Sequence, residues 1–416
     1  MINYFDILYS VFLKLTYFFI SIFKSFNPKI RAWVDGQILV WDDLKGLNPE
    51  NRPLLWFHVA SVGEFEQGRP LIERIRREYP NHFLLLSFFS PSGYNHLKNY
   101  SQVDKVCYLP LDTRSNVNQF LTIAQPKMAI FIKYEYWPNY INQISAKKIP
   151  LILVSAIFRE NQIFFKWYGG FFIKLLEKFD KIYLQNKNSQ NLLNSIGINK
   201  TEVVGDTRFD RVLENSKSLK DWEIKNKFIG RRSFIVCGSV WEEDMQRIIP
   251  LINNSLLNYR WIIVPHEIKS EQMKAWESRI DKPIVYSTQA EKTLDKQEVM
   301  IVDEMGKLSG LYKGASFAYI GGAFKKGLHN TLEAAVFGPP LFFGNKNYEK
   351  FDEAMNLVNN EIAFPIETDQ EILEKILYLE KNKKEREKIE EKSLDFILGS
   401  KGATEKIFDY IHTKNV

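Results

Sequence analysis

The carboxylate of Glu64 follows the turn Ser61-Val62-Gly63, directly after the apolar run 54–60. A carboxylate at the end of a strand can accept a proton from a substrate hydroxyl, which is general base chemistry. Apolar surroundings could raise the pKa of such a carboxyl toward neutrality. The spacing Ser61-x-x-Glu64 also fits a capping box, in which each side chain binds an orphan amide of the next helix. From the residues alone, Glu64 could therefore be either a helix cap or a catalytic base.

Polar residues follow other apolar runs as well. Glu135 comes after the run 127–132 and fits either an ion pair that positions a loop or a second site carboxylate. Gly321-Gly322 ends another run, and we predict a helix from about Asn330, where backbone amides and the helix dipole could receive a phosphate without a metal. The spacing Asn330-x-x-Glu333 fits a helix cap equally well.

These residues require elements that bring them to the ends of strands. Short apolar runs alternate with amphipathic stretches such as EQGRPLIERIRREY, which predicts parallel sheets with helices on both faces. A polar stretch near 212–232 divides two series of runs. The predicted domains are residues 1–35, 36–218, 219–395 and 396–416, the last a terminal helix. The predicted strands are 54–60, 82–89, 105–111, 127–135, 150–158 and 181–186, then 233–239, 260–267, 283–287, 299–304, 317–323, 339–345 and 361–367.

The first 26 residues are apolar and aromatic, interrupted by Asp6, Lys14 and Lys24. The start is not basic and no small-residue cleavage site follows, so we expect the segment to be retained. Its apolar part is near the lower length limit for a membrane span, and both a single span and an interfacial helix fit. A buried helix that covers the first domain is the third possibility. The basic residues from Lys24 to Arg31 favour the cytoplasmic side of a membrane.

Composition narrows the class of protein. The chain has 416 residues, 45% of them hydrophobic and 25% charged, which suits a globular protein with two cores. Cys107 and Cys237 lie in separate apolar runs, which favours free, buried thiols. A net charge of +6 is modest for this length, and we expect no nucleic-acid partner. No zinc-type spacing of ligands is present, and we expect neither a metal nor a cofactor.

Seven motifs occur in a fixed order: SVGE, SPSG, E-x-WPN, GDTRFD, VPH, MG-x-L and GG-x(6)-HN-x-LEAA. This series resembles the Kdo transferases, enzymes that move 3-deoxy-D-manno-octulosonic acid (Kdo) from CMP-Kdo to a lipid A precursor. The resemblance spans roughly residues 54–355. It implies a metal-independent, inverting glycosyltransferase of GT-B architecture, in which two Rossmann-like domains face each other across a cleft. It also implies lipopolysaccharide biosynthesis at the cytoplasmic face of the inner membrane of a Gram-negative bacterium, with lipid IVA as acceptor.

The same resemblance assigns roles to residues. It implies that Glu64 is the general base and that Glu135 supports the reaction. It points Glu333 at the ribose hydroxyls and Asn330 at the phosphate, and it brings His266, Met305 and Gly306 near the nucleoside. The remaining predicted donor-site residues are Gly321, Gly322 and His329, and the predicted acceptor-side residues are Ser61, Gly63, Ser92 and Gly93.

Two other functions fit the pattern less closely. One is a membrane-associated GT-B enzyme that uses a UDP-sugar. The other is a non-catalytic membrane protein that binds a nucleotide sugar.

Overall fold

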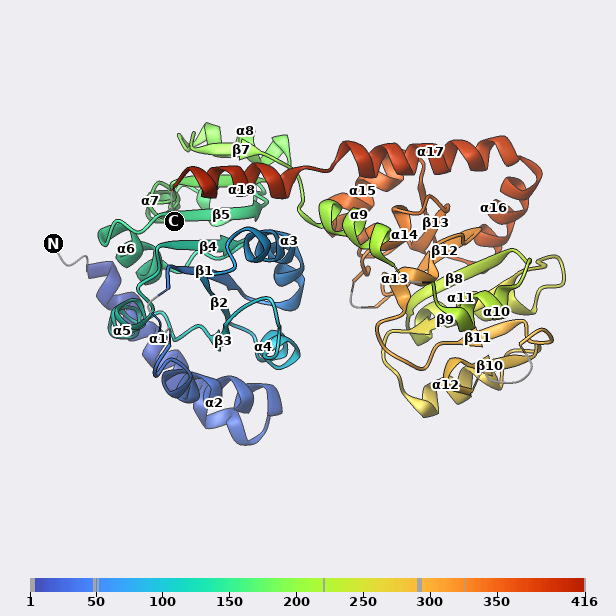
Figure 1. Ribbon diagram of the computed structural model, residues 1–416, viewed down its shortest axis with the longest axis horizontal. Coiled ribbons are helices and arrows are strands. Elements are labelled where there is room, and N and C mark those ends of the chain that lie inside the picture. Colours follow the sequence, from blue (N-terminus) through green and yellow to red (C-terminus); the bar gives the residue numbers. More distant parts are fainter. Residues whose placement is uncertain are drawn as a thin grey trace. The chain divides into compact units, whose positions relative to one another are not determined.

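The computed structural model describes residues 4–47, 50, 52–219, 221–289, 294–325 and 327–414. The chain forms two compact units, residues 1–210 with 401–416 and residues 211–400 (Figure 1). From the sequence we predicted these limits at 218/219 and 395/396. Helix α9 (Arg208–Ser218) continues across the limit at 210/211, so composition alone does not mark that limit. Residues 1–3 of the expected N-terminal segment lie outside the described residues.

The first unit is built on seven parallel strands in the order β3-β2-β1-β4-β5-β6-β7. The chain therefore runs outward from β1 in one direction, returns, and runs outward from β4 in the other. The strands are β1 (Leu54–Val59), β2 (Phe83–Phe88), β3 (Lys105–Tyr108), β4 (Met128–Ile132), β5 (Leu151–Ala156), β6 (Lys181–Leu184) and β7 (Thr201–Val203).

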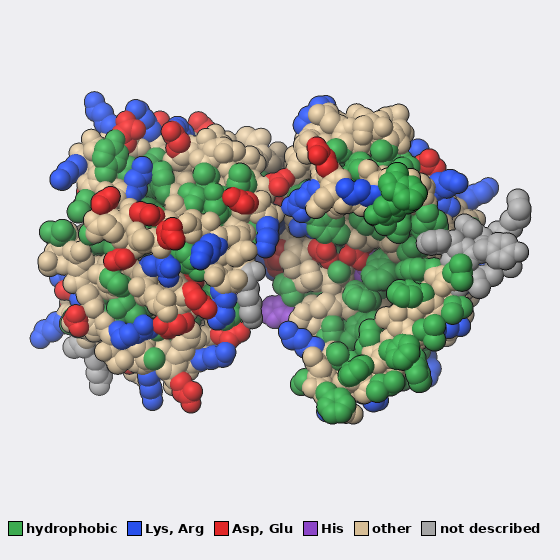
Figure 2. Space-filling view, turned by 180° about the vertical axis from the view of Figure 1, so that it is seen from behind, with side chains coloured by type: hydrophobic (Ala, Val, Ile, Leu, Met, Phe, Trp, Pro, Cys, Tyr) green, Lys and Arg blue, Asp and Glu red, His purple; other side chains and the backbone are tan. Residues whose placement is uncertain are grey.

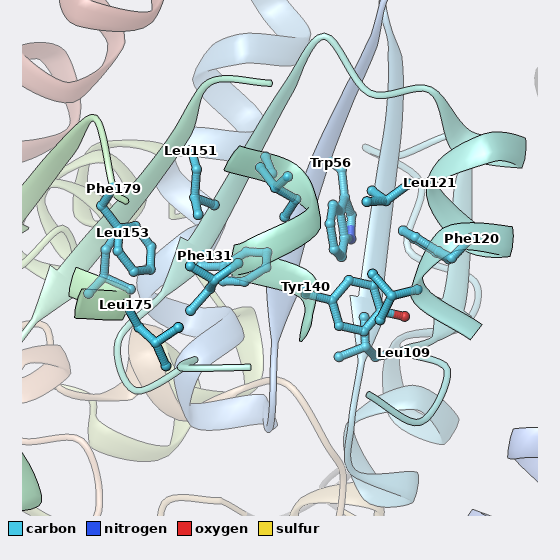
Figure 3. Close-up of a cluster of buried hydrophobic side chains, with 14 of the residues drawn as sticks. Trp56, Leu109, Phe120, Leu121, Phe131, Tyr140, Leu151, Leu153, Leu175 and Phe179 are labelled. Carbon is cyan, nitrogen blue, oxygen red and sulfur yellow. The ribbon is translucent and has the colours of Figure 1, made fainter. Parts of the chain in front are cut away.

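Helices cover both faces of this sheet, because its central strands are apolar on both sides. One face packs against α3 and α18 through residues such as Ile72 and Ile407. The other packs against α5, α6 and α7, where Trp56, Phe120 and Tyr140 meet (Figure 3). The helices of this unit are α1 (Tyr4–Ile22), α2 (Pro28–Asp43), α3 (Val62–Glu78), α4 (Pro91–Leu97), α5 (Arg114–Ala124), α6 (Pro138–Ala146), α7 (Gly170–Leu176), α8 (Lys187–Ser195) and α18 (Ala403–Thr413).

The N-terminal helix α1 lies against its own unit along one stripe. The Tyr9 hydroxyl binds Asp112, Ser10 Oγ is 3.4 Å from Asn139 Nδ2, and the rings of Tyr17 and Trp33 are 5.8 Å apart. The opposite stripe is exposed and apolar, and Figure 2 shows hydrophobic side chains gathered over α1 and α2. The exposed residues are Leu8, Val11, Phe12, Leu15, Phe18, Phe19, Ile22, Phe23, Phe26, Ile38 and Leu39.

By length and composition alone, the stretch Leu8–Ser25 is apolar enough to cross a membrane, and among the described residues it is the one such stretch. The exposed outer stripe argues against the expected alternative of a buried covering helix, although Tyr9, Ser10 and Tyr17 contact the rest of the unit.

The second unit repeats the architecture with seven parallel strands in the order β10-β11-β9-β8-β12-β13-β14. The strands are β8 (Phe234–Val240), β9 (Arg260–Pro265), β10 (Ile284–Tyr286), β11 (Val299–Ile301), β12 (Phe317–Ile320), β13 (Leu341–Gly344) and β14 (Ala363–Ile366). The helices are α10 (Glu223–Ile229), α11 (Glu242–Asn253), α12 (Ser270–Glu277), α13 (Leu308–Leu311), α14 (Leu332–Ala335), α15 (Asp352–Asn359), α16 (Asp369–Lys381) and α17 (Lys383–Gly399).

The expected fold class is confirmed: two Rossmann-like α/β units and an apolar N-terminal helix. All thirteen predicted strands are present. The strand β7 was not predicted, because it has three residues, all only half-buried, at one edge of its sheet. Both cysteines are free and buried, as expected.

Candidate functional site

Each sheet has one point where the strand order reverses, between β1 and β4 in the first unit and between β8 and β12 in the second. Ligands of open α/β sheets bind beside the carboxyl ends of the strands at such points. Glu64 follows β1, and Glu135 follows β4. In the second unit Trp241 follows β8, and Gly321-Gly322 follows β12. The topology thus brings most of the predicted residues to the two reversal points.

Glu64 is both a helix cap and an electrostatically perturbed carboxyl. It forms the predicted capping box with Ser61 at the start of α3, and its Oε2 accepts hydrogen bonds from the amides of Ala60 at 2.6 Å and Ser61 at 3.1 Å. Burial and the nearby charge of Glu135 raise the pKa of Glu64 to about 7, although the Ala60 amide, His58 and Lys133 act in the opposite direction. A carboxyl with this pKa is poised to exchange a proton near neutral pH.

Glu135 is almost fully buried beneath this edge of the sheet. Its Oε2 lies 2.8 Å from His58 Nε2 and accepts a hydrogen bond of 2.6 Å from Trp137 Nε1. Both partners come from the same edge, since His58 is in β1 and Trp137 directly precedes α6. The expected ion-pair role and the expected site role are therefore compatible.

The backbone leading to Glu135 is also unusual. Lys133 has a φ of +69°, a left-handed conformation that non-glycine residues seldom adopt. Such strain costs about 1–3 kcal/mol and is concentrated at functional sites. The Lys133 charge also lowers the pKa of Glu64.

The predicted acceptor-side residues differ in what they contribute. A Cβ at Gly93 would lie 2.5 Å from the ring of Phe88, so packing of α4 against β2 requires glycine there. A Cβ at Gly63 would meet only Ser61 Oγ, at 3.9 Å, so packing does not require that glycine. Gly63 and Ser92 are exposed, and Ser92 Oγ is 2.8 Å from Ser90 Oγ.

In the second unit three rings form a stack beside β8. The ring centroids of Trp241 and His266 are 4.4 Å apart, and those of His266 and His329 are 4.2 Å apart. Trp241 Nε1 donates to His329 Nε2 at 3.2 Å. Burial, and then the proximity of His266, lower the pKa of His329 to about 4. His329 is therefore neutral at physiological pH, with Nε2 as an acceptor.

Gly321 and Gly322 have structural reasons to be glycine. A Cβ at Gly321 would lie 2.3 Å from the Ser239 carbonyl oxygen, and Gly322 has a φ of +98°. The amide of Gly322 donates a hydrogen bond to Asp244 Oδ2 at 3.0 Å. This amide is therefore not available to a phosphate, contrary to our expectation that backbone amides here would bind one. Asp244 also accepts from the Trp241 amide and from the Tyr319 hydroxyl.

The segment after this turn also differs from expectation. The helix α14 begins at Leu332 rather than at Asn330 and has four residues, too few for a strong dipole. Glu333 does not cap it. Instead, its carboxylate accepts from Ser309 Oγ at 2.6 Å and from Asn330 Nδ2 at 3.0 Å.

Glu333 and Ser309 line a shallow surface hollow. Its other lining residues are Val212, Asn215, Ser216, Leu219, Val336 and Phe337. Met305 is 75% exposed and Gly306, with a φ of +79°, is exposed beside it. Both residues are exposed and can therefore contact a ligand as they stand.

Three residues of the site were not predicted from the sequence: His58, Trp241 and Asp244. A histidine within an apolar strand and the loop WEED after β8 were the available signals. Within the described residues, no group of three or more His, Cys, Asp or Glu side chains could hold a metal ion.

Known proteins resemble this chain in sequence and in fold. A family profile described as 3-deoxy-D-manno-octulosonic-acid transferase (kdotransferase) matches residues 40–211. A 3-deoxy-D-manno-octulosonic acid transferase from Aquifex aeolicus is 30% identical, over 82% of this chain and 89% of the relative. One from Rickettsia bellii is 29% identical, over 84% and 85%. The crystal structure of UDP-GlcNAc 2-epimerase from Neisseria meningitidis has a TM-score of 0.62 at 14% identity, covering 86% of this chain and all of the other, which shows a shared fold.

Proposed function

The chain belongs to the family of Kdo transferases, which are glycosyltransferases, and on this basis we propose that it transfers Kdo from CMP-Kdo to the lipid A precursor lipid IVA, with Glu64 as general base. The observation that carries the proposal is the pKa of Glu64, raised to about 7 at the β1/β4 reversal point. A base with this pKa is largely ionised at cytoplasmic pH and still accepts a proton readily.

In the proposed reaction a hydroxyl of the acceptor attacks the anomeric carbon of Kdo. Its proton passes to the Glu64 carboxylate as the new carbon–oxygen bond forms. The bond from the anomeric carbon to the phosphate oxygen breaks, CMP leaves with the electron pair, and the configuration inverts. Glu135 supports this step through its charge, which raises the proton affinity of Glu64.

We assign the donor to the second unit. Glu333 would accept hydrogen bonds from the ribose hydroxyls, since Ser309 and Asn330 hold its carboxylate at the edge of a hollow. The cytosine would lie near His266, Met305 and Gly306. Because the Gly322 amide is engaged, the phosphate would depend on Asn330 and on Lys325, whose Nζ lies 3.3 Å from Glu243 Oε1 and 4.6 Å from the centre of the Trp241 ring.

We further propose that α1 lies in the interface of the cytoplasmic leaflet of the inner membrane, close to the acceptor. A contiguous exposed apolar surface of this kind is typical of membrane contact. The stripe of α1 that contacts the rest of its unit favours a helix that lies on the membrane over one that crosses it.

Mass spectrometry of the acceptor tests the reaction. The purified full chain is incubated with a tetraacylated lipid A precursor and CMP-Kdo generated in situ, and in parallel with UDP-sugars. We expect one or more Kdo additions by the wild type and none by Glu64→Gln. The matched control is Glu66→Gln, which makes the same substitution at a second glutamate, about half a turn further along α3. We expect this variant to remain active.

Turnover with a UDP-sugar alone would contradict the proposed donor. Binding of CMP without any transfer by the wild type would favour the non-catalytic alternative. Activity of a well-folded Glu64→Gln variant comparable to that of Glu66→Gln would contradict the role of Glu64 as base.

A further inference from the structure

His58 is an uncommon occupant of its position. It lies in the central strand β1, in a row of six buried residues, and its side chain has no exposed surface. The rings of Trp56, Phe131 and Trp137 surround it, with centroids 6.3, 5.5 and 6.2 Å away. An apolar side chain would fill such a position at lower desolvation cost. The imidazole therefore needs an explanation beyond packing.

Both ring nitrogens of His58 have polar partners. Nε2 is 2.8 Å from Glu135 Oε2, and Nδ1 is 2.9 Å from Ser87 Oγ. Ser87 Oγ in turn accepts a hydrogen bond of 2.8 Å from Trp56 Nε1. These contacts join two strands of the sheet core to the carboxylate that follows β4.

The proton of the contact between His58 and Glu135 can be assigned to one partner. An ionised carboxylate only accepts, so the proton of the Nε2–Oε2 contact belongs to His58. Nδ1 lies 2.9 Å from Ser87 Oγ and 3.1 Å from the Ser87 carbonyl oxygen, and a carbonyl oxygen can only accept. Trp137 Nε1 donates to the same Oε2 from the other side. Two donors, His58 Nε2–H and Trp137 Nε1–H, thus point toward Oε2 of Glu135, and the Trp137 nitrogen also lies 3.0 Å from His58 Nε2.

We propose that His58 is a positioning residue, whose Nε2–H fixes the Glu135 carboxylate next to Glu64 for transfer of the sugar. The inference rests on the proposed function, in which Glu64 is the base. His58 does not touch the substrate and acts through Glu135. Both of the hydrogen bonds described above are made by Oε2, which fixes this oxygen and sets the direction of Oε1.

The position of Glu135 matters because its charge acts on Glu64. The groups that act on Glu64 are Glu135, which raises its pKa, and His58, Lys133 and the Ala60 amide, which lower it. A Glu135 that moved away from Glu64 would change the proton affinity of the base. Loss of the His58 contact is therefore expected to change turnover and its pH dependence, not merely stability.

Two substitutions of His58 separate the two ring nitrogens. The amide nitrogen of glutamine can replace Nε2 and donate to Glu135, whereas that of asparagine reaches only the position of Nδ1. We expect His58→Gln to keep kcat within about tenfold of wild type, and His58→Asn to lose about 100-fold, the usual cost of a misplaced catalytic group. The KM for the sugar nucleotide is expected to stay unchanged in both.

Trp137→Phe provides an independent variant in case His58→Asn does not fold. It removes the second donor to Oε2, and we expect it to lower kcat without raising the KM of the donor. The losses in the double variant His58→Asn, Trp137→Phe are expected to be less than the product of the single losses, because both act on one oxygen. His96→Asn, an exposed histidine of the same unit, serves as control.

The kinetics are measured with whichever sugar nucleotide the wild type turns over, together with the melting temperature of each variant. A donor other than CMP-Kdo would overturn the proposed function but leave this comparison intact. Equal losses in His58→Gln and His58→Asn, or losses that follow the melting temperature alone, would overturn the positioning role of His58.

Discussion

The carboxylates of Glu64 and Glu135 lie close enough for the charge of the second to raise the pKa of the first. They reach this arrangement from strands β1 and β4, which are neighbours in the sheet although β2 and β3 separate them in the chain. Two like charges beside one another at a partly buried edge raise the proton affinity of at least one of them. The relationship gives the site its expected pH dependence.

We expect kcat/KM to rise with pH through a midpoint near 7, because Glu64 must be ionised to accept a proton. Glu135→Gln removes a negative charge that raises the pKa of Glu64, so its midpoint should move to lower pH. The measurement is a profile of initial rates from pH 5 to pH 9 for both proteins. A midpoint in Glu135→Gln at or above that of the wild type would contradict the electrostatic link.

Glu64 should also make the folded state sensitive to pH. Its folded pKa of about 7 is above the ordinary value of 4.5, so the folded state binds the proton more tightly. This contribution to stability is present in full below pH 4.5 and is lost as the pH rises through 7. We expect it to amount to about 1–3 kcal/mol.

Glu64→Gln lacks this term and keeps an acceptor oxygen for the Ala60 amide. The difference in melting temperature between Glu64→Gln and the wild type should therefore be a few degrees larger, in favour of the variant, at pH 8.5 than at pH 5. This follows because each kcal/mol of stability shifts the melting temperature by about 2–4 °C. Thermal unfolding at both pH values measures the difference, with Glu66→Gln as control. A difference independent of pH would show that Glu64 is not perturbed.

Glu333→Gln should weaken the binding of CMP. A hydrogen bond between a hydroxyl and a carboxylate contributes about 1.5–3 kcal/mol, which corresponds to roughly 10- to 100-fold in Kd. Isothermal titration calorimetry with CMP measures this change. Glu374→Gln on the exposed side of α16 is the matched control, and equal affinities of the two variants would exclude Glu333 from the nucleotide site.

Gly322→Ala should disturb the turn after β12. A Cβ there would lie 2.5 Å from the Gly327 carbonyl oxygen and 2.7 Å from His329 Cδ2, in a backbone conformation with a φ of +98°. We expect the free energy of unfolding to fall by more than about 1 kcal/mol, which lowers the melting temperature, and we expect CMP to bind more weakly. Gly399→Ala, where a Cβ would meet nothing within 4 Å, should be neutral for both measurements.

Removal of apolar side chains from α1 should weaken membrane binding. Phe12 and Phe19 are 64% and 58% exposed, and the double variant Phe12→Ser, Phe19→Ser should bind vesicles of anionic phospholipid about 10- to 100-fold less tightly. Co-sedimentation with vesicles measures this. Ile123→Ser removes an exposed apolar side chain elsewhere in the same unit and should have no effect. Unchanged sedimentation of the double variant would contradict membrane contact through α1.

The fold was largely readable from the chain itself. Apolar runs such as 54–60 and 317–323 can only be buried as strands between helices, and capping spacings such as Ser61 to Glu64 mark where helices begin. The strand β7 escaped detection because three half-buried residues carry too little pattern. Motif order indicated the family, although one motif, GDTRFD, follows β7, the strand that the pattern did not predict.

The hydrogen-bond partners and pKa values of the site residues depended on the tertiary structure. No spacing in the sequence relates His58 to Ser87 or Glu135, because these residues meet only when β1 pairs with β2 and β4. Likewise the engagement of the Gly322 amide by Asp244 joins the ends of β8 and β12. Local patterns determine which segments become strands and helices. The pKa of a carboxyl and the partners of an amide depend on burial and on neighbours distant in the chain, which only the folded arrangement supplies.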